Sequence, residues 1–374
     1  MASQAGRRAA FALAAALAFL GGGVGAALTQ SNPGGDAASA APPGSAVAAA
    51  LTPRPTGLAA ATPKPTPTAG AVATPRASPA ATPKPTPKPT PKPTPKPVVI
   101  PPLSACAIFP ATNVWNKRVD GLPVAANSDA MVAAIGIGSS LHPDFSATGY
   151  GIPYNVVGSS TPRSTVSFTY ASESDRVRYP IPAKPKIEGG SDRHLLMVDT
   201  NACKLYELFA AVHTTSGWHA GSGAVWDLRS NRLRPAGWTS ADAAGLPILP
   251  GLVRYDDVLR GAIKHAIRFT APVTCNGYIY PARHKAGSGS CATRPPMGLR
   301  VRLKKSVDIS KYGSQARIVL TALKRYGMIL ADNGSPWYIT GAPSSKWNDD
   351  VLHTLGGIKG SDFEVVDTTG FVNG

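Results

Sequence analysis

Apolar and polar residues alternate along several short stretches after residue 160, which is the two-residue period of a β-strand. STVSFTY (164–170) places Val166, Phe168 and Tyr170 on one face. LRVRL (299–303) places three aliphatic side chains on one face and two arginines on the other. The pattern predicts strands that each bury one face in a core.

Other stretches are apolar on both faces or end in turn signals. HLLMVD (194–199) and KLYELF (204–209) are joined by TNAC, which predicts a hairpin buried on both sides. AIKHAIRFT (262–270) places His265 on an otherwise apolar face. MILADNGSPWYIT (328–340) contains an Asn-Gly pair, which predicts a second hairpin.

Helices are predicted to be few and short. Ser128 caps one that Gly136 ends, an amphipathic helix follows Ser314 and is stopped by Gly327, and Asn348 begins another. No alternation of strands and helices, internal repeat or phosphate-binding loop occurs. The predicted fold is therefore mainly β, an antiparallel β-sandwich or jelly roll with a few short helices.

Composition divides the chain of 374 residues into three parts. Residues 1–28 contain two arginines and then an uncharged run, 9–28, which is typical of an export signal or of a retained membrane anchor. Residues 29–101 are rich in Pro, Thr, Lys and Ala, and we expect a disordered, extended linker. Residues 102–374 hold every Cys, Trp and His and form one predicted globular domain.

The net charge of +17 is shared between these parts. The first 101 residues carry nine Lys and Arg against one acidic residue, and the predicted domain carries 29 against 20. The domain is therefore basic, which favours an anionic partner. The basic residues are spread out and form no nucleic-acid-binding motif, so no nucleic acid is expected as a partner.

Four cysteines in an exported chain predict two disulfides, although free thiols are the alternative. Three pairings are possible. Cys275 and Cys291 flank a Gly- and Ser-rich loop, which favours a local bridge and leaves Cys106 with Cys203. No zinc site is predicted because no CxxC motif occurs.

The first candidate site is in the predicted hairpin. With TNAC as a four-residue loop, Leu196 faces Glu207 and His194 faces Phe209. His194 and Glu207 are then diagonal neighbours about 7–8 Å apart at the backbone. They could act as acid and base or hold a metal, or they could be a buried structural pair.

A second set of candidates follows at YIYPARHKAGSGSC (278–291). There, Arg283 could neutralise a substrate carboxylate, while Tyr280 or His284 removes a proton. These roles suit β-elimination in a uronic-acid polymer, and a plain basic surface loop is the alternative. His265 is a further candidate, with a core histidine as the alternative.

WHAGSGAVWDL (218–228) supplies tryptophans that could stack on sugars or fill a core. Its Asp227, together with Glu207, could form the carboxylate pair of a glycosidase.

The phrases GLPILPGLVRYD, HAIRFT and ALKRYGMILADNG resemble those of a group of uncharacterised secreted bacterial proteins. The resemblance covers most of residues 103–367. It implies an exported domain with the same β-rich core and brings no activity, cofactor or catalytic residue.

These features together predict a secreted or surface-tethered domain that acts on or binds an extracellular, anionic polysaccharide. As an enzyme it would be a polysaccharide lyase or a glycoside hydrolase without a cofactor, and the membrane would be contacted only through residues 9–28. The alternatives are a non-catalytic cell-wall or adhesion module and a metal-dependent enzyme with His ligands. In the catalytic version, four side chains converge on one cleft with Arg283 and Tyr280: His194, Glu207, His265 and His284.

Overall fold

The structure is a computed structural model that describes residues 102–371. The predicted export segment (1–28) and linker (29–101) lie outside the described residues. Within residues 102–371, no helix is long and apolar enough to cross a bilayer.

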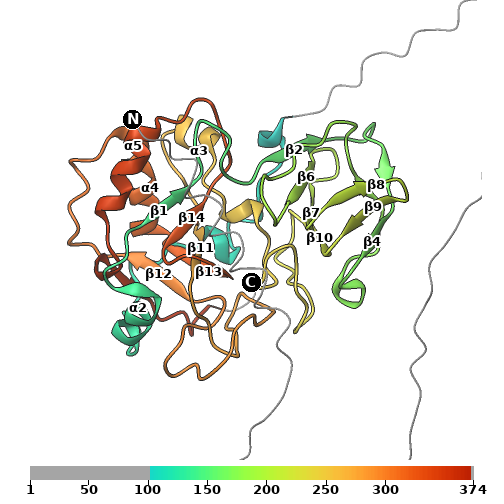
Figure 1. The fold of residues 1–374 in the computed structure, drawn as a ribbon. Helices are drawn as coiled ribbons and strands as arrows, with labels where there is room; N and C mark the ends of the chain where they lie inside the picture. The colour runs from blue at the N-terminus through green and yellow to red at the C-terminus, as the bar shows by residue number, and fades with distance from the viewer. Residues whose placement is uncertain (1–101, 372–374) are drawn as a thin grey trace, which may run out of the picture. The chain divides into compact units, whose positions relative to one another are not determined.

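The larger sheet has six strands in the order β1-β14-β11-β13-β12-β15 (Figure 1). β1 pairs with β14 and β11 pairs with β13 in parallel, and the other three pairings are antiparallel. The strands are β1 (His142–Asp144), β11 (Ile267–Ala271), β12 (Arg300–Leu303), β13 (Met328–Asn333), β14 (Tyr338–Thr340) and β15 (Phe363–Val365).

The second sheet has four strands in the order β10-β7-β6-β2, with β2 parallel to β6. Leu196 pairs with Glu207, so the predicted hairpin and its register are confirmed. The strands are β2 (Tyr154–Val157), β6 (Leu195–Asp199), β7 (Lys204–Phe209) and β10 (Ser222–Asp227).

Two small sheets accompany the second sheet, with β3 beside β5 and with β9 between β4 and β8. The strands are β3 (Arg163–Ser164), β4 (Val166–Phe168), β5 (Tyr179–Pro180), β8 (Val212–Thr214) and β9 (Gly217–Ala220). The β-rich fold is confirmed. The expectation of purely antiparallel sheets is wrong, because parallel partners come from distant parts of the chain and leave no local sequence signal.

The helices are short, as predicted. The predicted cap at Ser128 is wrong, because Ser128 is the first helical residue and its hydroxyl accepts a hydrogen bond from the distant Val365 amide. Asn348 caps the last α-helix. The α-helices are α2 (Ser128–Gly136), α3 (Tyr255–Leu259), α4 (Ser314–Arg325) and α5 (Asp349–His353). The 3₁₀ turns are η2 (Leu103–Ala105), η3 (Val114–Asn116), η4 (Ala171–Glu173), η5 (Leu249–Gly251), η6 (Thr354–Gly357) and η7 (Gly360–Asp362).

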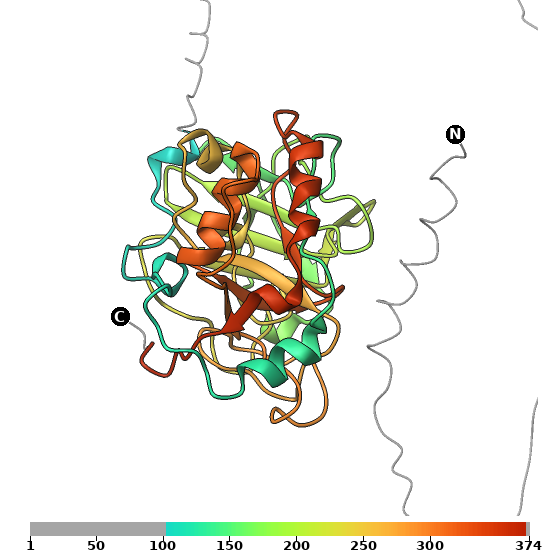
Figure 2. The ribbon, with the colours of Figure 1, turned by 90° about the vertical axis from the view of Figure 1, so that its left-hand side faces the viewer.

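The six-stranded sheet has one apolar and one polar face because side chains alternate along each strand. Val301 and Leu303 alternate with Arg300 and Arg302, as the sequence predicts. Helices lie in front of the sheet in Figure 2, and α4 buries its apolar stripe in the core beside β12. Arg268 lies on the same face as Arg300, because both residues pair in register with Ile329 of β13.

The four-stranded sheet is buried on both faces, which explains its doubly apolar sequence. Leu196 and Val198 join the large core that includes the six-stranded sheet. Leu195 and Met197 join a smaller core with Tyr179 of the two-stranded sheet. Burial on both sides fixes the register of this hairpin, since a slip of one residue would expose alternate side chains and bury polar ones.

The predicted hairpin over residues 328–340 is wrong. Its two strands, β13 and β14, are both present, but β11 lies between them. The turn after Asn333 crosses the end of β11, where the Gly334 amide donates to the Ala271 carbonyl. The pairing of β13 and β14 with the apolar strand β11 therefore replaces the local hairpin pairing that the Asn-Gly turn predicts.

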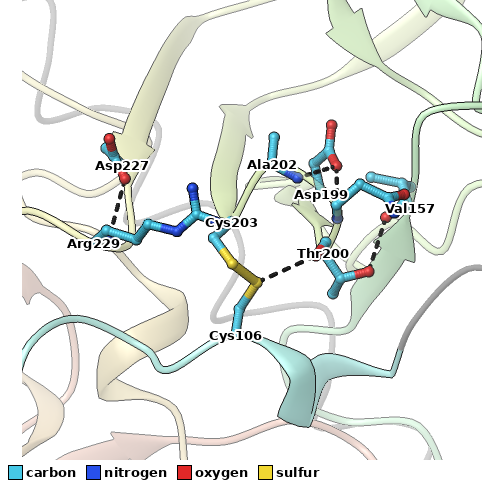
Figure 3. The surroundings of a disulfide bond; sticks show 9 residues. Cys106, Val157, Asp199, Thr200, Ala202, Cys203, Asp227 and Arg229 are labelled. Carbon is cyan, nitrogen blue, oxygen red and sulfur yellow. Dashed lines mark hydrogen bonds between the residues drawn. A yellow bond between two sulfur atoms is a disulfide. The ribbon is translucent and has the colours of Figure 1, made fainter.

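Both predicted disulfides are confirmed. Cys106 bonds to Cys203, in the turn between β6 and β7, and its sulfur lies 3.4 Å from the Thr200 carbonyl oxygen (Figure 3). Cys275 and Cys291 close the local loop. Two disulfides indicate that the domain folds in an oxidising environment.

Candidate functional site

The site is built on the bridging segment, residues 239–253, which lies between the two large sheets. On one side, the Ser222 hydroxyl of β10 donates to the Ser240 carbonyl at 2.6 Å. On the other side, the Ala244 amide donates to Ala331 of β13, and the Val253 amide donates to Thr340 of β14. The segment therefore fixes the distance between the sheets.

Three of the predicted catalytic residues hold this segment in place. His194 Nε2 donates to the Ala241 carbonyl at 2.9 Å, and His284 Nδ1 donates to the Ala243 carbonyl at 2.8 Å. Glu207 accepts hydrogen bonds from the Ile248 and Leu249 amides at 2.9–3.0 Å. Each side chain binds the backbone of the bridging segment.

Glu207 cannot touch a substrate directly because it has no exposed surface. Burial raises its pKa to about 7, although the two backbone amides favour the charged form. Asp227 pairs in register with Lys204, and the side chain of Lys204 lies on the face of β7 opposite to that of Glu207. The predicted glycosidase pair of Glu207 and Asp227 is therefore wrong.

The other predicted residues do not join them in one cleft. Arg283 Nε donates to the Arg234 carbonyl at 2.9 Å, and Tyr280 lies close to the buried Arg300. His265 lines a separate pocket that none of the other five predicted residues lines. The prediction of one shared cleft is wrong because His194, Glu207 and His284 are used to bind the backbone of the bridging segment, while the other three residues have separate surroundings.

A different group of charged side chains occupies the polar face, and we call it the Arg268 cluster. Its centre is Arg268 of β11, whose side chain is 4% exposed. Arg268 donates to Asp242 of the bridging segment from Nε at 3.0 Å and from Nη2 at 2.7 Å, and to Thr340 Oγ1 at 2.6 Å. The members are Asp144, Glu188, His194, Asp242, Arg268, Asp332 and Thr340.

Two carboxyl groups of the cluster are only partly buried. Asp332 of β13 has a side chain 27% exposed, and its Oδ2 lies 3.6 Å from Arg268 Nη2. Burial and the negative charge of Asp242 raise the pKa of Asp332. Asp144 pairs in register with Thr340, and burial raises its pKa, with a further contribution from Glu188. Both groups therefore favour the protonated form more than an ordinary aspartate does.

The pKa of Glu188 is shifted in the opposite direction to those of Asp332 and Asp144. Its Oε2 lies 2.5 Å from His194 Nδ1, and its side chain is 18% exposed. Burial alone would raise the pKa of Glu188, but the hydrogen bond and charge of His194 outweigh it and lower that pKa. Burial alone would lower the pKa of His194, but Glu188 raises it to about 9. The pair is therefore a carboxylate and an imidazolium at neutral pH.

An aromatic pair lies on the same face as Asp144. The rings of His142 and Tyr338 stack with centroids 4.1 Å apart, and His142 is exposed. Both residues are two positions from a cluster member along β1 and β14, so they share its face. The arrangement places an accessible aromatic surface beside carboxyl groups.

Sequence reasoning missed most of this cluster. Arg268 and Asp332 lie inside phrases that carry the resemblance, yet no motif marks them or Asp242 as a site. The signal that could have found Arg268 is an arginine within an apolar strand, which must find a carboxylate partner if it is buried. In the sequence, nothing distinguishes Asp144 and Glu188 from the other acidic residues.

The cluster brings a carboxyl group with a raised pKa and one with a lowered pKa close to Arg268, which is the combination that acid–base catalysis uses. Within residues 102–371, no group of three or more His, Cys, Asp or Glu side chains is arranged to hold a metal ion. No protein-family model, curated protein sequence or solved structure matches this chain.

Proposed function

We propose that this protein hydrolyses glycosidic bonds of an extracellular glycan at the Arg268 cluster. The observation that carries the proposal is the placement of two partly exposed carboxyl groups: Asp332 Oδ2 lies 3.6 Å from Arg268 Nη2, and Glu188 Oε2 lies 2.5 Å from His194 Nδ1. These surroundings raise the pKa of Asp332 and lower that of Glu188. Glycosidases need such a pair, one group protonated and the other ionised. The two disulfides and the predicted export segment support a target outside the cell.

In this mechanism, Asp332 donates its proton to the glycosidic oxygen as the bond from that oxygen to the anomeric carbon breaks. Glu188 accepts a proton from water, whose oxygen bonds to the same carbon. The net reaction adds one water molecule across the bond. Arg268 and His194 hold the two carboxyl groups, and the His142–Tyr338 stack offers a surface for a sugar ring.

The cluster favours hydrolysis over β-elimination. Elimination from a uronic acid needs a free cation to neutralise the substrate carboxylate. Arg268 already donates to Asp242 and Thr340, and His194 is engaged by Glu188. Carboxyl groups also outnumber cations here, so a neutral sugar fits the point of cleavage better than a uronate does.

The test is release of new reducing ends from a panel of neutral and anionic polysaccharides. Asp332→Asn and Glu188→Gln should each lower the rate by about 100-fold or more, which is the usual contribution of general acid–base groups. Asp227→Asn is the matched control because Asp227 is an exposed aspartate outside the cluster. Thermal unfolding of each variant separates lost chemistry from lost folding.

Retained activity in folded Asp332→Asn and Glu188→Gln proteins would reject the assignment. Products with unsaturated sugar ends would show elimination instead. Glycan binding without turnover, unchanged in both variants, would favour the non-catalytic wall-binding module.

A further inference from the structure

The exposed side of α4 and the loop before it, residues 304–325, form a basic surface that we call the α4 surface. This segment contains six Lys and Arg and one acidic residue, whereas the domain contains 29 and 20. α4 lies in front of the six-stranded sheet in Figure 2 and buries one side, so its opposite side faces solvent. The six cationic side chains are exposed or half-buried: Lys304, Lys305, Lys311, Arg317, Lys324 and Arg325.

Hydrogen bonds place the loop directly beside α4. Lys324 Nζ donates to the Lys305 carbonyl at 2.9 Å and to the Val307 carbonyl at 2.6 Å. Nearer the start of the helix, Arg317 Nη1 lies 3.4 Å from the Ser310 carbonyl oxygen, to which it donates. The cations of the loop and those of the helix therefore belong to one continuous surface.

The surface is extended along α4 and ends at a small hollow. Arg317, Thr321 and Arg325 lie on one side of the helix because residues four apart share a face. At 1.5 Å per residue, the Cα atoms of Arg317 and Arg325 are about 12 Å apart along the axis. Arg325 and Thr321 then line a hollow of about 110 Å³ together with Lys264, which follows α3. This hollow is too small for a whole sugar but has room for one acidic group.

The positive charges of this surface have no counter-charge in the described part of the protein. Within residues 102–371, neither the six cations nor Lys264 forms an ion pair. The carbonyls that bind Lys324 carry no net charge. The single acidic residue, Asp308, accepts a hydrogen bond from the Ser310 amide at 2.8 Å. One carboxylate cannot neutralise six cations, so most of the charge is available to a partner.

The end of the helix explains only part of this charge. Lys324 and Arg325 lie in the last turn of α4, where cations stabilise the negative end of the helix dipole. The other four cations lie outside that turn. A partner with several negative charges is therefore the complement that fits the whole surface.

The side chains of this surface favour a hydrated polymer over a membrane or a nucleic acid. No large apolar or aromatic side chain of residues 304–325 is exposed. The surface therefore lacks the apolar anchor that membrane-bound helices insert, and it lacks the rings on which single-stranded bases stack. The two disulfides indicate an oxidising environment, which also favours an extracellular polymer.

We infer that the α4 surface binds an acidic polysaccharide. Carboxylates along the polymer would lie at Arg317 and at the loop lysines, and one would enter the hollow between Lys264 and Arg325. Arginine binds a carboxylate through two parallel hydrogen bonds, and lysine binds it as a point charge. This binding is independent of the Arg268 cluster, and it would hold the domain on a glycan whether or not that cluster cleaves one.

The test is binding of the full chain to polygalacturonate, a linear polymer of uronic acids, measured by biolayer interferometry. Neutral dextran should not bind. Raising the salt concentration from about 0.05 M to about 0.5 M should weaken polygalacturonate binding at least about tenfold, because salt screens exposed charges. Equal binding of dextran, or binding that does not depend on salt, would overturn the proposal.

Two variants of equal net charge locate the site. The surface variant neutralises three exposed cations of the α4 surface: Lys305→Gln, Arg317→Gln and Arg325→Gln. The control variant neutralises three exposed cations elsewhere: Arg176→Gln, Lys184→Gln and Arg229→Gln. The surface variant should bind polygalacturonate at least about tenfold more weakly, because it loses three charge-assisted contacts, and the control should bind normally. Equal effects of both variants, or no effect of the surface variant, would overturn the assignment.

Other polyanions are tested with the same two variants. Tighter binding to phosphatidylglycerol vesicles or to duplex DNA than to polygalacturonate, lost in the surface variant, would overturn the assignment to a polysaccharide. Asp332→Asn should bind polygalacturonate normally, so failure of the proposed hydrolysis and failure of this surface are distinguished.

Discussion

The guanidinium of Arg268 meets the carboxylate of Asp242 through two hydrogen bonds, and the two side chains are 4% and 0% exposed. Arg268 belongs to the central region of the six-stranded sheet, and Asp242 belongs to the bridging segment. The pair therefore fixes the segment to the polar face on which the Arg268 cluster is built. Both partners are almost completely buried, so each carboxylate or guanidinium charge depends on the other for its stabilisation.

Removing one partner of this pair should be strongly destabilising. Asp242→Asn leaves a buried guanidinium without its counter-charge, and Arg268→Met leaves a buried carboxylate, so each should cost about 3–5 kcal/mol. The double variant should cost less than the sum of the two single variants, because no lone charge remains. Urea unfolding followed by fluorescence measures all three. Additive costs would contradict direct coupling of the two charges.

Glu207 should make stability depend on pH in an unusual direction. Its pKa is about 7 in the folded chain and 4.5 when exposed, so the folded state binds more protons between these values. The stability contributed by Glu207 is fully present below pH 4.5 and is lost as pH rises to 7, a change of about 3 kcal/mol. Glu207→Gln should remove this slope from unfolding measurements between pH 4.5 and 7.

The matched control for Glu207 is Glu364→Gln, at a carboxylate that is partly exposed and paired with Arg302. It should leave the slope between pH 4.5 and 7 in place. An unchanged slope in Glu207→Gln would show that Glu207 is ionised throughout this range.

Local features were predictable from the sequence, and long-range ones were not. The four-residue turn and the doubly apolar strands fix the pairing of Leu196 with Glu207, and the rings of His194 and Phe209 lie 5.8 Å apart as that register requires. The cysteine pairs follow from their placement in loops and turns. Such features depend on neighbours in the chain.

The Arg268 cluster depends instead on contacts across almost 200 residues. Asp144 and Thr340 meet only because β1 adds in parallel to β14, and parallel pairing gives no local pattern. Asp332 reaches Arg268 only because β11 inserts beside β13. His194 and Glu207 looked catalytic because nothing in the sequence shows that the bridging segment would cover them.

The ion pair of His194 and Glu188 should be lost at high pH. The pKa of His194 is raised from 6.5 to about 9, so the stability from its charge is fully present below pH 6.5 and declines as pH rises through 9. Glu188→Gln should move the pKa of His194 well below 9, because it removes the charge that holds the proton. NMR titration of the His194 ring measures this shift. An unchanged titration would contradict the pairing, and His213, exposed and distant in sequence, is the internal reference.

The two disulfides should contribute unequally to stability. Cys106 and Cys203 are separated by 97 positions, whereas Cys275 and Cys291 are separated by 16. A longer closed loop removes more conformational entropy from the unfolded chain, which predicts a loss of about 4.7 kcal/mol for Cys106→Ala with Cys203→Ala and about 3 kcal/mol for Cys275→Ala with Cys291→Ala. Guanidinium unfolding of both double variants tests the order. A larger loss for the short loop would show that the bridge at Cys275 maintains native packing beyond its effect on the unfolded chain.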